Sequence, residues 1–200
     1  MDADALHDVR QLASADAQQR TAALAHLVGL GPRATDAIVA ALGASAAGVR
    51  ALLAQALAEI GDPRSAQALA QLLHDPDPRV RGRGAQGLAA LHDPRAVAAL
   101  VATIDDLPDL LHYPHTVATY ALISLGAAAL PAVLPLLRAA DLQTRTRAWL
   151  VWQSVVSSEP GVGDWAALWQ QSGSYAPDAP QARREAAVQQ WEQWLAARQP

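Results

Sequence analysis

The chain has 200 residues, a formal net charge of −4 and no cysteine. Without cysteine it has no disulfide, no thiolate metal site and no cysteine nucleophile. The acidic balance also disfavours nonspecific binding to nucleic acid, which requires a basic surface. Alanine and leucine dominate the hydrophobic residues and phenylalanine is absent, a composition that favours helices over sheets.

The N-terminal residues, MDADALHDVRQ, lack the basic start and apolar run of a signal peptide. No run of about 18 uninterrupted apolar residues occurs anywhere in the sequence. We therefore expect a soluble cytoplasmic protein without a membrane segment. Residues 5–13 are expected to form a short helix that covers the first repeat of the fold.

Four segments align without gaps when each is counted from its first residue, the anchor, to the residue eleven positions later. The seventh position after the anchor is always leucine, and the tenth is leucine or isoleucine. The anchors recur with a period of roughly 30 to 35 residues, which is typical of helical-hairpin solenoids. The segments are Arg20–Gly31, Arg50–Gly61, Arg81–His92 and His115–Gly126, and the leucines at the seventh position are Leu27, Leu57, Leu88 and Leu122.

The period predicts an all-α superhelix of about five helical hairpins that forms one continuous domain. Residues 1–140 would contain the N-terminal cap helix and four repeats. Residues 141–200 would contain a degenerate fifth repeat and a tryptophan-rich C-terminal cap. The four repeats are placed at about 16–43, 45–75, 76–106 and 110–140.

Aspartate followed by proline occurs at the expected helix starts, in Asp62-Pro63, Asp77-Pro78 and Asp93-Pro94. Aspartate caps the free amides of a helix N-terminus, and proline suits the first helical position. We therefore interpret these aspartates as structural rather than catalytic.

Two further features concern packing. Gly82, Gly84 and Gly87 lie inside one predicted helix, where each glycine costs about 1 kcal/mol relative to alanine, so we expect a neighbouring helix to approach closely there. Pro131 and Pro135 interrupt the second helix of the fourth repeat, which predicts a kink or a short helix.

All six tryptophans lie at or beyond position 149. A helix is expected from Asp164 to Gln171, and a last helix from about Pro180 presents Trp191 and Trp194 on one face. Most of the rings are interpreted as a plug that closes the end of the stack. The alternative is that Trp165, Trp169 or Trp191 anchors a partner, since tryptophan is enriched in interface hot spots.

The Asp-Pro-Arg turns, and the segment Asp75-Pro-Asp-Pro-Arg-Val-Arg81 that precedes an Ala/Leu/Gly helix, resemble the bacterial HEAT-like repeats of phycocyanobilin lyase subunits. The resemblance is specific in the second and third repeats and poor after residue 141. It implies a right-handed superhelix with first helices on the convex side and second helices on the concave side. HEAT-like proteins mostly bind other proteins, although some act on bilins and one group excises damaged DNA bases.

Three arginines follow the interhelix turn in successive repeats: Arg33, Arg64 and Arg95. Because they recur at the same place in each repeat, we expect a ladder along one edge of the stack, which could hold an acidic partner segment. The alternative is a row of solvated arginines that pair with nearby aspartates.

His112 and His115 lie in the insertion of the fourth repeat near several aspartates, a composition that could hold a divalent metal. A surface loop with incidental histidines is the preferred interpretation, because no second histidine pair accompanies them. We predict no metal, no cofactor and no catalytic residue.

The leading hypothesis is a noncatalytic scaffold that binds a protein or peptide, possibly acidic, on the second-helix surface. A bilin or cofactor lyase or chaperone subunit is the first alternative, and a HEAT-like DNA glycosylase is the second.

Overall fold

The computed structural model describes residues 2–43 and 45–198. Within these residues every regular element is an α-helix or a 3-10 helix, apart from an isolated backbone bridge between Pro108 and Thr116. The predicted all-α class is confirmed. The chain forms two compact units, with the boundary between Leu107 and Pro108.

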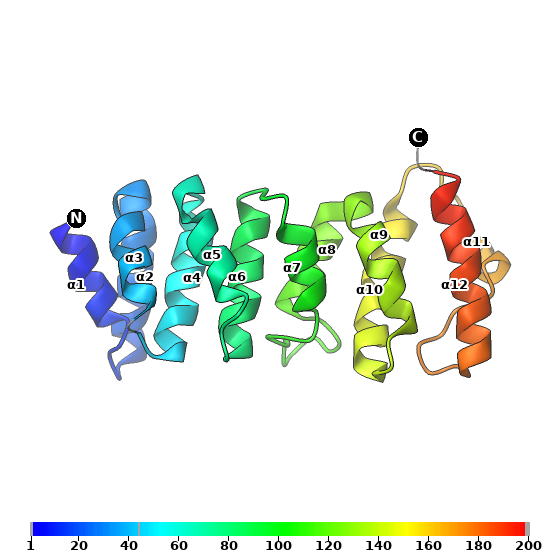
Figure 1. Ribbon diagram of the computed structural model, residues 1–200, viewed down its shortest axis with the longest axis horizontal. Helices are drawn as coiled ribbons and strands as arrows, with labels where there is room; N and C mark the ends of the chain where they lie inside the picture. Colours follow the sequence, from blue (N-terminus) through cyan, green and yellow to red (C-terminus); the bar gives the residue numbers. More distant parts are fainter. Residues whose placement is uncertain (1, 44, 199–200) are drawn as a thin grey trace. The chain divides into compact units, whose positions relative to one another are not determined.

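The first unit is a row of helical hairpins preceded by a short helix (Figure 1). In each hairpin the first helix has 13 or 14 residues and the second has 7 or 8. The helices are α1 (Ala3–Gln11), α2 (Ala17–Leu30), α3 (Thr35–Leu42), α4 (Ala47–Ile60), α5 (Ala66–Leu72), α6 (Pro78–Ala90) and α7 (Ala96–Ala102). Two 3-10 helices, η1 (Gly31–Arg33) and η2 (Pro63–Ser65), join the helices of the first two hairpins.

The leucines that define the repeat form the core of this unit. Leu27, Leu57 and Leu88 are fully buried, and the first helices that carry them pack against one another, α2 on α4 and α4 on α6. Burying one such side chain stabilises a fold by about 1.5 to 3 kcal/mol. The inward orientation that the repeat predicts for these leucines is therefore confirmed.

The turn between α4 and α5 ties its hairpin to the preceding one. The Asp62 carboxylate accepts hydrogen bonds from the Arg64 guanidinium at 2.6 and 2.9 Å and from the Arg64 backbone N–H at 3.0 Å. It also accepts one from Oγ1 of Thr35 in α3, at 2.7 Å. The guanidinium is the main reason that the pKa of Asp62 is lowered, despite burial, to about 2. The expected structural role of this aspartate is confirmed.

Replacing Asp62 with asparagine is expected to lower the free energy of unfolding by about 1 to 2 kcal/mol at pH 7, because a charged acceptor is lost from shielded hydrogen bonds. A carboxyl group whose pKa is lowered by folding stabilises the fold above its unfolded pKa, near 3.8, and loses that contribution as the pH falls toward 2. Urea titrations followed by circular dichroism should therefore show a constant difference between wild type and variant above about pH 5, and a shrinking one below about pH 4.

Asp93 supplies a matched control for this variant. It begins the same turn one repeat later and pairs with Arg95, but the position equivalent to Thr35 is Ala66, which has no hydroxyl group. Asp93→Asn should therefore cost less than Asp62→Asn. Equal losses, or a difference that does not vary with pH, would contradict the role assigned to Asp62.

The glycines of α6 allow α5 to approach it closely. A Cβ atom on Gly84 would lie 2.9 Å from the carbonyl oxygen of Leu69, and one on Gly87 would lie 2.7 Å from a methyl carbon of the same leucine. A side chain at Gly84 would meet backbone, and one at Gly87 would have to displace the Leu69 side chain, so the predicted close helix contact is confirmed there. At Gly82 the neighbour is Leu107, which follows α7, at 3.2 Å.

The second unit combines two long helices with several shorter and less regular elements. Pro131 and Pro135 confine one of its α-helices to four residues, followed by a 3-10 helix, which confirms the short helix predicted there. The elements are α8 (Val117–Leu125), η3 (Gly126–Ala129), α9 (Leu130–Val133), η4 (Leu134–Arg138), α10 (Leu142–Ser158), α11 (Trp165–Gln171) and α12 (Gln181–Ala196).

Residues 117–138 are long and apolar enough to cross a membrane by composition, with a mean hydropathy of 1.9. The structure divides this segment at Gly126, whose φ of +62° ends α8. Its longest α-helix has nine residues, whereas a membrane span needs about 20. The pieces α8, α9 and η4 pack on α10 instead, so the segment forms part of the packing of the second unit.

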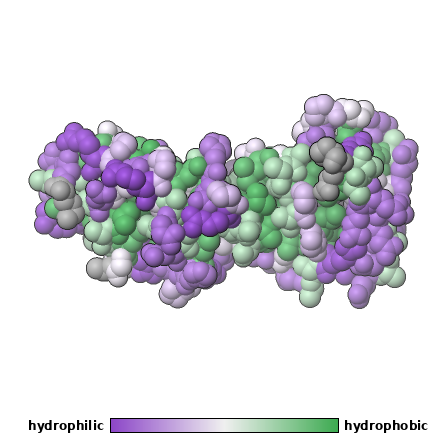
Figure 2. Space-filling model, turned by 45° about the horizontal axis from the view of Figure 1, so that its top comes forward, coloured by the Kyte–Doolittle hydropathy of each residue, from purple (hydrophilic) through white to green (hydrophobic). Residues whose placement is uncertain are grey.

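The last helix folds back on its own unit, where α12 packs against η4. Arg138 joins the two elements through Glu185 at 2.7 Å and Glu192 at 2.6 Å. Upstream of α12, the buried hydroxyl group of Tyr175 donates to the carbonyl oxygen of Leu137 at 2.7 Å. Hydrophilic side chains cover the outer face of this helix (Figure 2).

Candidate functional site

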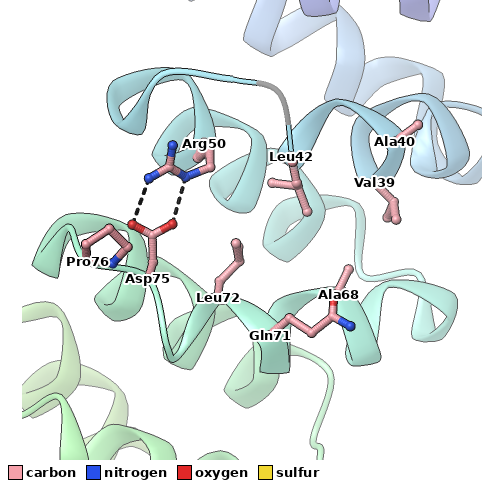
Figure 3. A pocket seen from close by; sticks show the side chains of 10 residues that line it. Val39, Ala40, Leu42, Arg50, Ala68, Gln71, Leu72, Asp75 and Pro76 are labelled. Atoms are coloured by element: carbon pink, nitrogen blue, oxygen red, sulfur yellow. Dashed lines mark hydrogen bonds and ion pairs between the residues drawn. The ribbon is translucent and has the colours of Figure 1, made fainter.

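A groove lies between the second helices α3 and α5 of the first unit, with a volume of about 560 Å³. It forms because α3 packs on α4 and α5 packs on α6. Figure 3 shows that the side chains facing the groove are mostly small or apolar. The lining residues that these helices contribute are Val39, Ala40, Leu42, Ala68, Gln71 and Leu72.

A charged pair closes one end of the groove (Figure 3). Arg50 of α4 donates to both carboxylate oxygens of Asp75, from Nε at 2.7 Å and Nη2 at 2.8 Å. Its Nη1 donates to the carbonyl oxygen of Ser45 at 2.6 Å. The hydrogen bond from Arg50 is the main reason that the pKa of Asp75 is lowered. Each nitrogen of this guanidinium has a partner, so the pair braces the groove.

The groove combines an apolar floor with an exposed polar rim. Leu42 and Leu72 are buried at its base, while Ala40 and Gln71 are exposed. The Gln71 amide can both donate and accept hydrogen bonds. A surface of this kind can receive an apolar side chain and hold the backbone beside it.

The three arginines of the predicted ladder lie along one edge of the first unit, each bonded to the preceding repeat or cap helix. Arg33 pairs with Asp2 at 2.7 Å, and Arg64 reaches Asp36 at 3.1 Å in addition to its own turn aspartate. Arg95 repeats the arrangement with Asp93 at 2.7 Å and, more weakly, with the Gln67 side chain at 3.3 Å. Each of the three guanidinium groups therefore has a carboxylate partner.

The six tryptophans gather in the second unit. Trp152 and Trp191 are fully buried, and the other four are half-buried. Trp191 contacts several other rings, including Trp152 at 5.5 Å between ring centroids. Complete burial leaves no part of Trp191 for a partner in this structure, whereas Trp165 and Trp169 retain partial exposure.

The insertion of the fourth repeat is an ordered loop built on Asp109. This carboxylate accepts hydrogen bonds from the ring of His112 at 2.9 Å and the hydroxyl of Tyr120 at 3.0 Å, and its pKa is lowered to about 2, chiefly by His112. His115 stacks on Tyr120 instead of joining His112. No cluster of three metal-ligating side chains occurs within 2–43 and 45–198. Leu110 and Leu111 at the tip of the loop are 89% and 87% exposed.

One histidine–carboxylate pair lies in a shallow hollow between α1 and α2. The ring of His26 contacts Asp8 at 2.6 Å, the arrangement that orients a general base. The side chains that line this hollow include no hydroxyl or thiol group, so the pair has no serine, threonine or cysteine beside it to activate.

The brace between Arg50 and Asp75 was not predicted from the sequence, although Arg50 anchors a repeat. The signal was present, because Arg81 and Asp106 form the same pair one repeat later and at the same sequence separation. An aspartate 25 residues after each of these two anchor arginines would have located this brace. The groove itself has no comparable signal, because its walls are ordinary alanines and leucines.

Comparison with known protein families gives a match over part of the chain. Residues 35–112 match the family model of HEAT repeats, and no curated protein matches the chain. Among solved structures, the complex of CpcE and CpcF of phycocyanin lyase from Nostoc sp. PCC7120 is similar, with 24% identity, a TM-score of 0.48, and coverage of 90% of this chain and 73% of that one.

Two artificial proteins are also similar in structure. An engineered protein is 18% identical, with a TM-score of 0.43 and 98% of each chain covered. A designed armadillo repeat protein is 18% identical, with a TM-score of 0.41, and 92% of this chain and 98% of that one are covered.

The stacked hairpins of the first unit and the buried repeat leucines define a helical-repeat protein. The family match falls on those hairpins, from α3 through α7 and beyond. Residues 35–112 therefore carry HEAT-like repeats.

Proposed function

We propose that this protein is a noncatalytic binding module whose first unit holds a segment of another protein across α3 and α5. The observation that carries the proposal is the groove between these helices, with its volume of about 560 Å³. Its size falls within the range of about 300 to 1,000 Å³ that is typical of binding pockets.

The lining of the groove indicates the kind of segment that it accepts. Apolar side chains of the partner would enter between Leu42 and Leu72, while Gln71 at the rim would bond the partner's backbone. The Arg50–Asp75 pair keeps the groove open without presenting an unpaired charge. We therefore propose an extended peptide with one or two apolar anchors.

The edge formed by Arg33, Arg64 and Arg95 is proposed as a secondary contact. Arg33 is the most exposed of the three, with 70% of its side chain accessible, so it has the most freedom to turn toward an acidic residue. Exposed ion pairs of this kind contribute only about 0 to 1 kcal/mol. The groove would supply most of the affinity.

The proposal predicts that Ala40→Glu weakens peptide binding. Ala40 is exposed at the groove, so a glutamate there would place a charge over an apolar floor without disturbing the core. Peptides selected from a displayed random library on the wild-type protein supply the probe. Their dissociation constants, measured by isothermal titration calorimetry, should rise at least about tenfold in the variant, which corresponds to about 1.4 kcal/mol.

Ala25→Glu is the matched control. Ala25 is an exposed alanine of a first helix, α2, and the same charge there should leave peptide affinity unchanged. Circular dichroism should show equal helicity for both variants. Selected peptides that bind both variants equally well, or a library that yields no binder, would refute the groove as the binding surface.

A further inference from the structure

A second hollow lies within the second unit, between α10 and α11. Its volume is about 220 Å³, and its lining consists of Trp149, Gln153, Trp165 and Trp169. Three of these four side chains are indoles, all of them half-buried. Parts of three indole rings are therefore accessible to solvent within one hollow.

The local helix geometry positions these side chains. Trp149 and Gln153 are four residues apart on α10, and Trp165 and Trp169 are four residues apart on α11, so each pair shares one face of its helix. The rings of Trp149 and Trp165 meet across the gap, with their centroids 5.9 Å apart and their planes at 40°. Each of the two helices thus contributes two of the four side chains that line the hollow.

Contacts behind the hollow hold its rings in place. Trp165 stacks on the buried Trp191, with centroids 5.9 Å apart and planes at 14°. The indole N–H of Trp169 donates to the carbonyl oxygen of Tyr175 at 3.0 Å. The tryptophans are therefore preorganised, which lowers the entropic cost of binding.

The charge around the hollow favours a positive ligand. The faces of indole rings carry partial negative charge and attract cations, and the lining includes no arginine. Asp164 precedes Trp165 and caps α11 through the amides of Ala166 and Ala167, so the positive end of that helix is compensated. The same unit already contains a guanidinium on an indole, with Arg198 4.1 Å from the ring centre of Trp194.

We propose that this indole pocket, formed by Trp149, Gln153, Trp165 and Trp169, binds an organic cation of the methylated ammonium class. Its volume lies below the range of about 300 to 1,000 Å³ that is usual for drug-sized ligands, so it accepts one head group. Methylation suits the site because it spreads the charge over an apolar surface that desolvates easily. The proposal concerns the second unit and does not depend on the peptide groove of the first.

Titration with choline and with its neutral isostere, 3,3-dimethylbutan-1-ol, tests the role of charge. We expect choline to shift the indole N–H signals of the pocket in two-dimensional NMR spectra and to bind at least about tenfold more tightly than the alcohol, a difference of about 1.4 kcal/mol. Equal affinities would show a merely apolar hollow and overturn the proposal. Absence of binding by choline would overturn it as well.

The same spectra identify the source of the cation. A peptide that carries trimethyllysine should bind more tightly than choline if the natural ligand is a methylated side chain, and no more tightly if it is a free small molecule. The matching peptide with unmodified lysine should bind more weakly than the trimethylated one. Equal binding of the two peptides would contradict recognition of the methylated head group.

Gln153 allows a test that leaves the aromatic packing intact, because its side chain is exposed on α10. Gln153→Glu should strengthen choline binding several-fold, and Gln153→Arg should abolish it. Gln190→Glu, on the exposed face of α12, is the control and should change nothing. Unchanged affinity in Gln153→Arg, with native circular dichroism, would exclude this pocket as the cation site.

Discussion

Replacing Trp191 with alanine is expected to lower the free energy of unfolding of the second unit by about 4 kcal/mol, within the range for large aromatic residues truncated in a core. Trp191 is fully buried and lies against the rings of Trp152, Trp165 and Trp194. Its removal leaves a cavity at the centre of this cluster. Few other single truncations in the unit remove as much buried surface.

Fluorescence provides a selective measurement of this effect, because every tryptophan and tyrosine of the chain lies beyond residue 108. Urea unfolding followed by tryptophan emission therefore reports on the second unit. Trp191→Phe should lose less than half as much stability as the alanine variant, because it preserves a ring and removes a buried indole N–H that has no acceptor. Gln190→Ala, an exposed change on the same helix, should be nearly silent.

A loss below about 1 kcal/mol in Trp191→Ala, smaller than any usual core truncation of this size, would mean that Trp191 does not close the cluster. Trp191 would then again be a candidate anchor for a partner. The expected result instead separates the tryptophans by role. Trp152 and Trp191 hold the unit together, and Trp165 and Trp169 offer ring surface to a ligand.

The repeat architecture of the first unit could be predicted from the sequence because its determinants are local and periodic. Leu57 and Leu88 are buried for the same reason, one repeat apart, so each supports the interpretation of the other. The cap at Asp62 and the close contact at Gly84 follow from the properties of single residue types in a known helical context. Both features can be predicted without knowledge of distant parts of the chain.

The candidate sites were harder to predict, because they depend on neighbours that the pattern does not specify. The indole pocket exists because Trp191, which lies on a different helix from Trp165, supports that ring from behind. The arginine ladder is a different case. The regular spacing of Arg64 and Arg95 allowed either a row that holds a partner or arginines that pair with nearby aspartates, and both guanidinium groups pair with an aspartate of their own repeat.

The proposed peptide groove shows why a repeat pattern does not reveal a binding surface. Ala40 and Ala68 line it, and alanine in a helix carries no sign of whether it faces a neighbour, water or a ligand. The distance between two short second helices decides this, and that distance is set by the first helices behind them. Helix packing therefore decides whether these alanines line a groove, and the repeat pattern does not specify that packing.

Replacing Gly84 with alanine is expected to destabilise the first unit by about 1 to 3 kcal/mol, the usual cost of overpacking. The added methyl group would lie 2.9 Å from the carbonyl oxygen of Leu69 and 3.0 Å from Cβ of Leu72. The backbone of α5 would have to move, because a carbonyl group cannot rotate away as a flexible side chain can. This strain should exceed the gain of about 1 kcal/mol in helix propensity.

Gly48→Ala is the matched control for this variant, since Gly48 lies in α4 with open space where a Cβ atom would be added. Without a clash, alanine should stabilise by about 0.5 to 1 kcal/mol through helix propensity alone. Circular dichroism at 222 nm reports on both units and tryptophan emission on the second. A change confined to the circular dichroism transition would therefore locate the effect in the first unit. Stabilisation by both substitutions would show that α5 can retreat from α6 without cost, and the walls of the peptide groove would then be mobile rather than fixed.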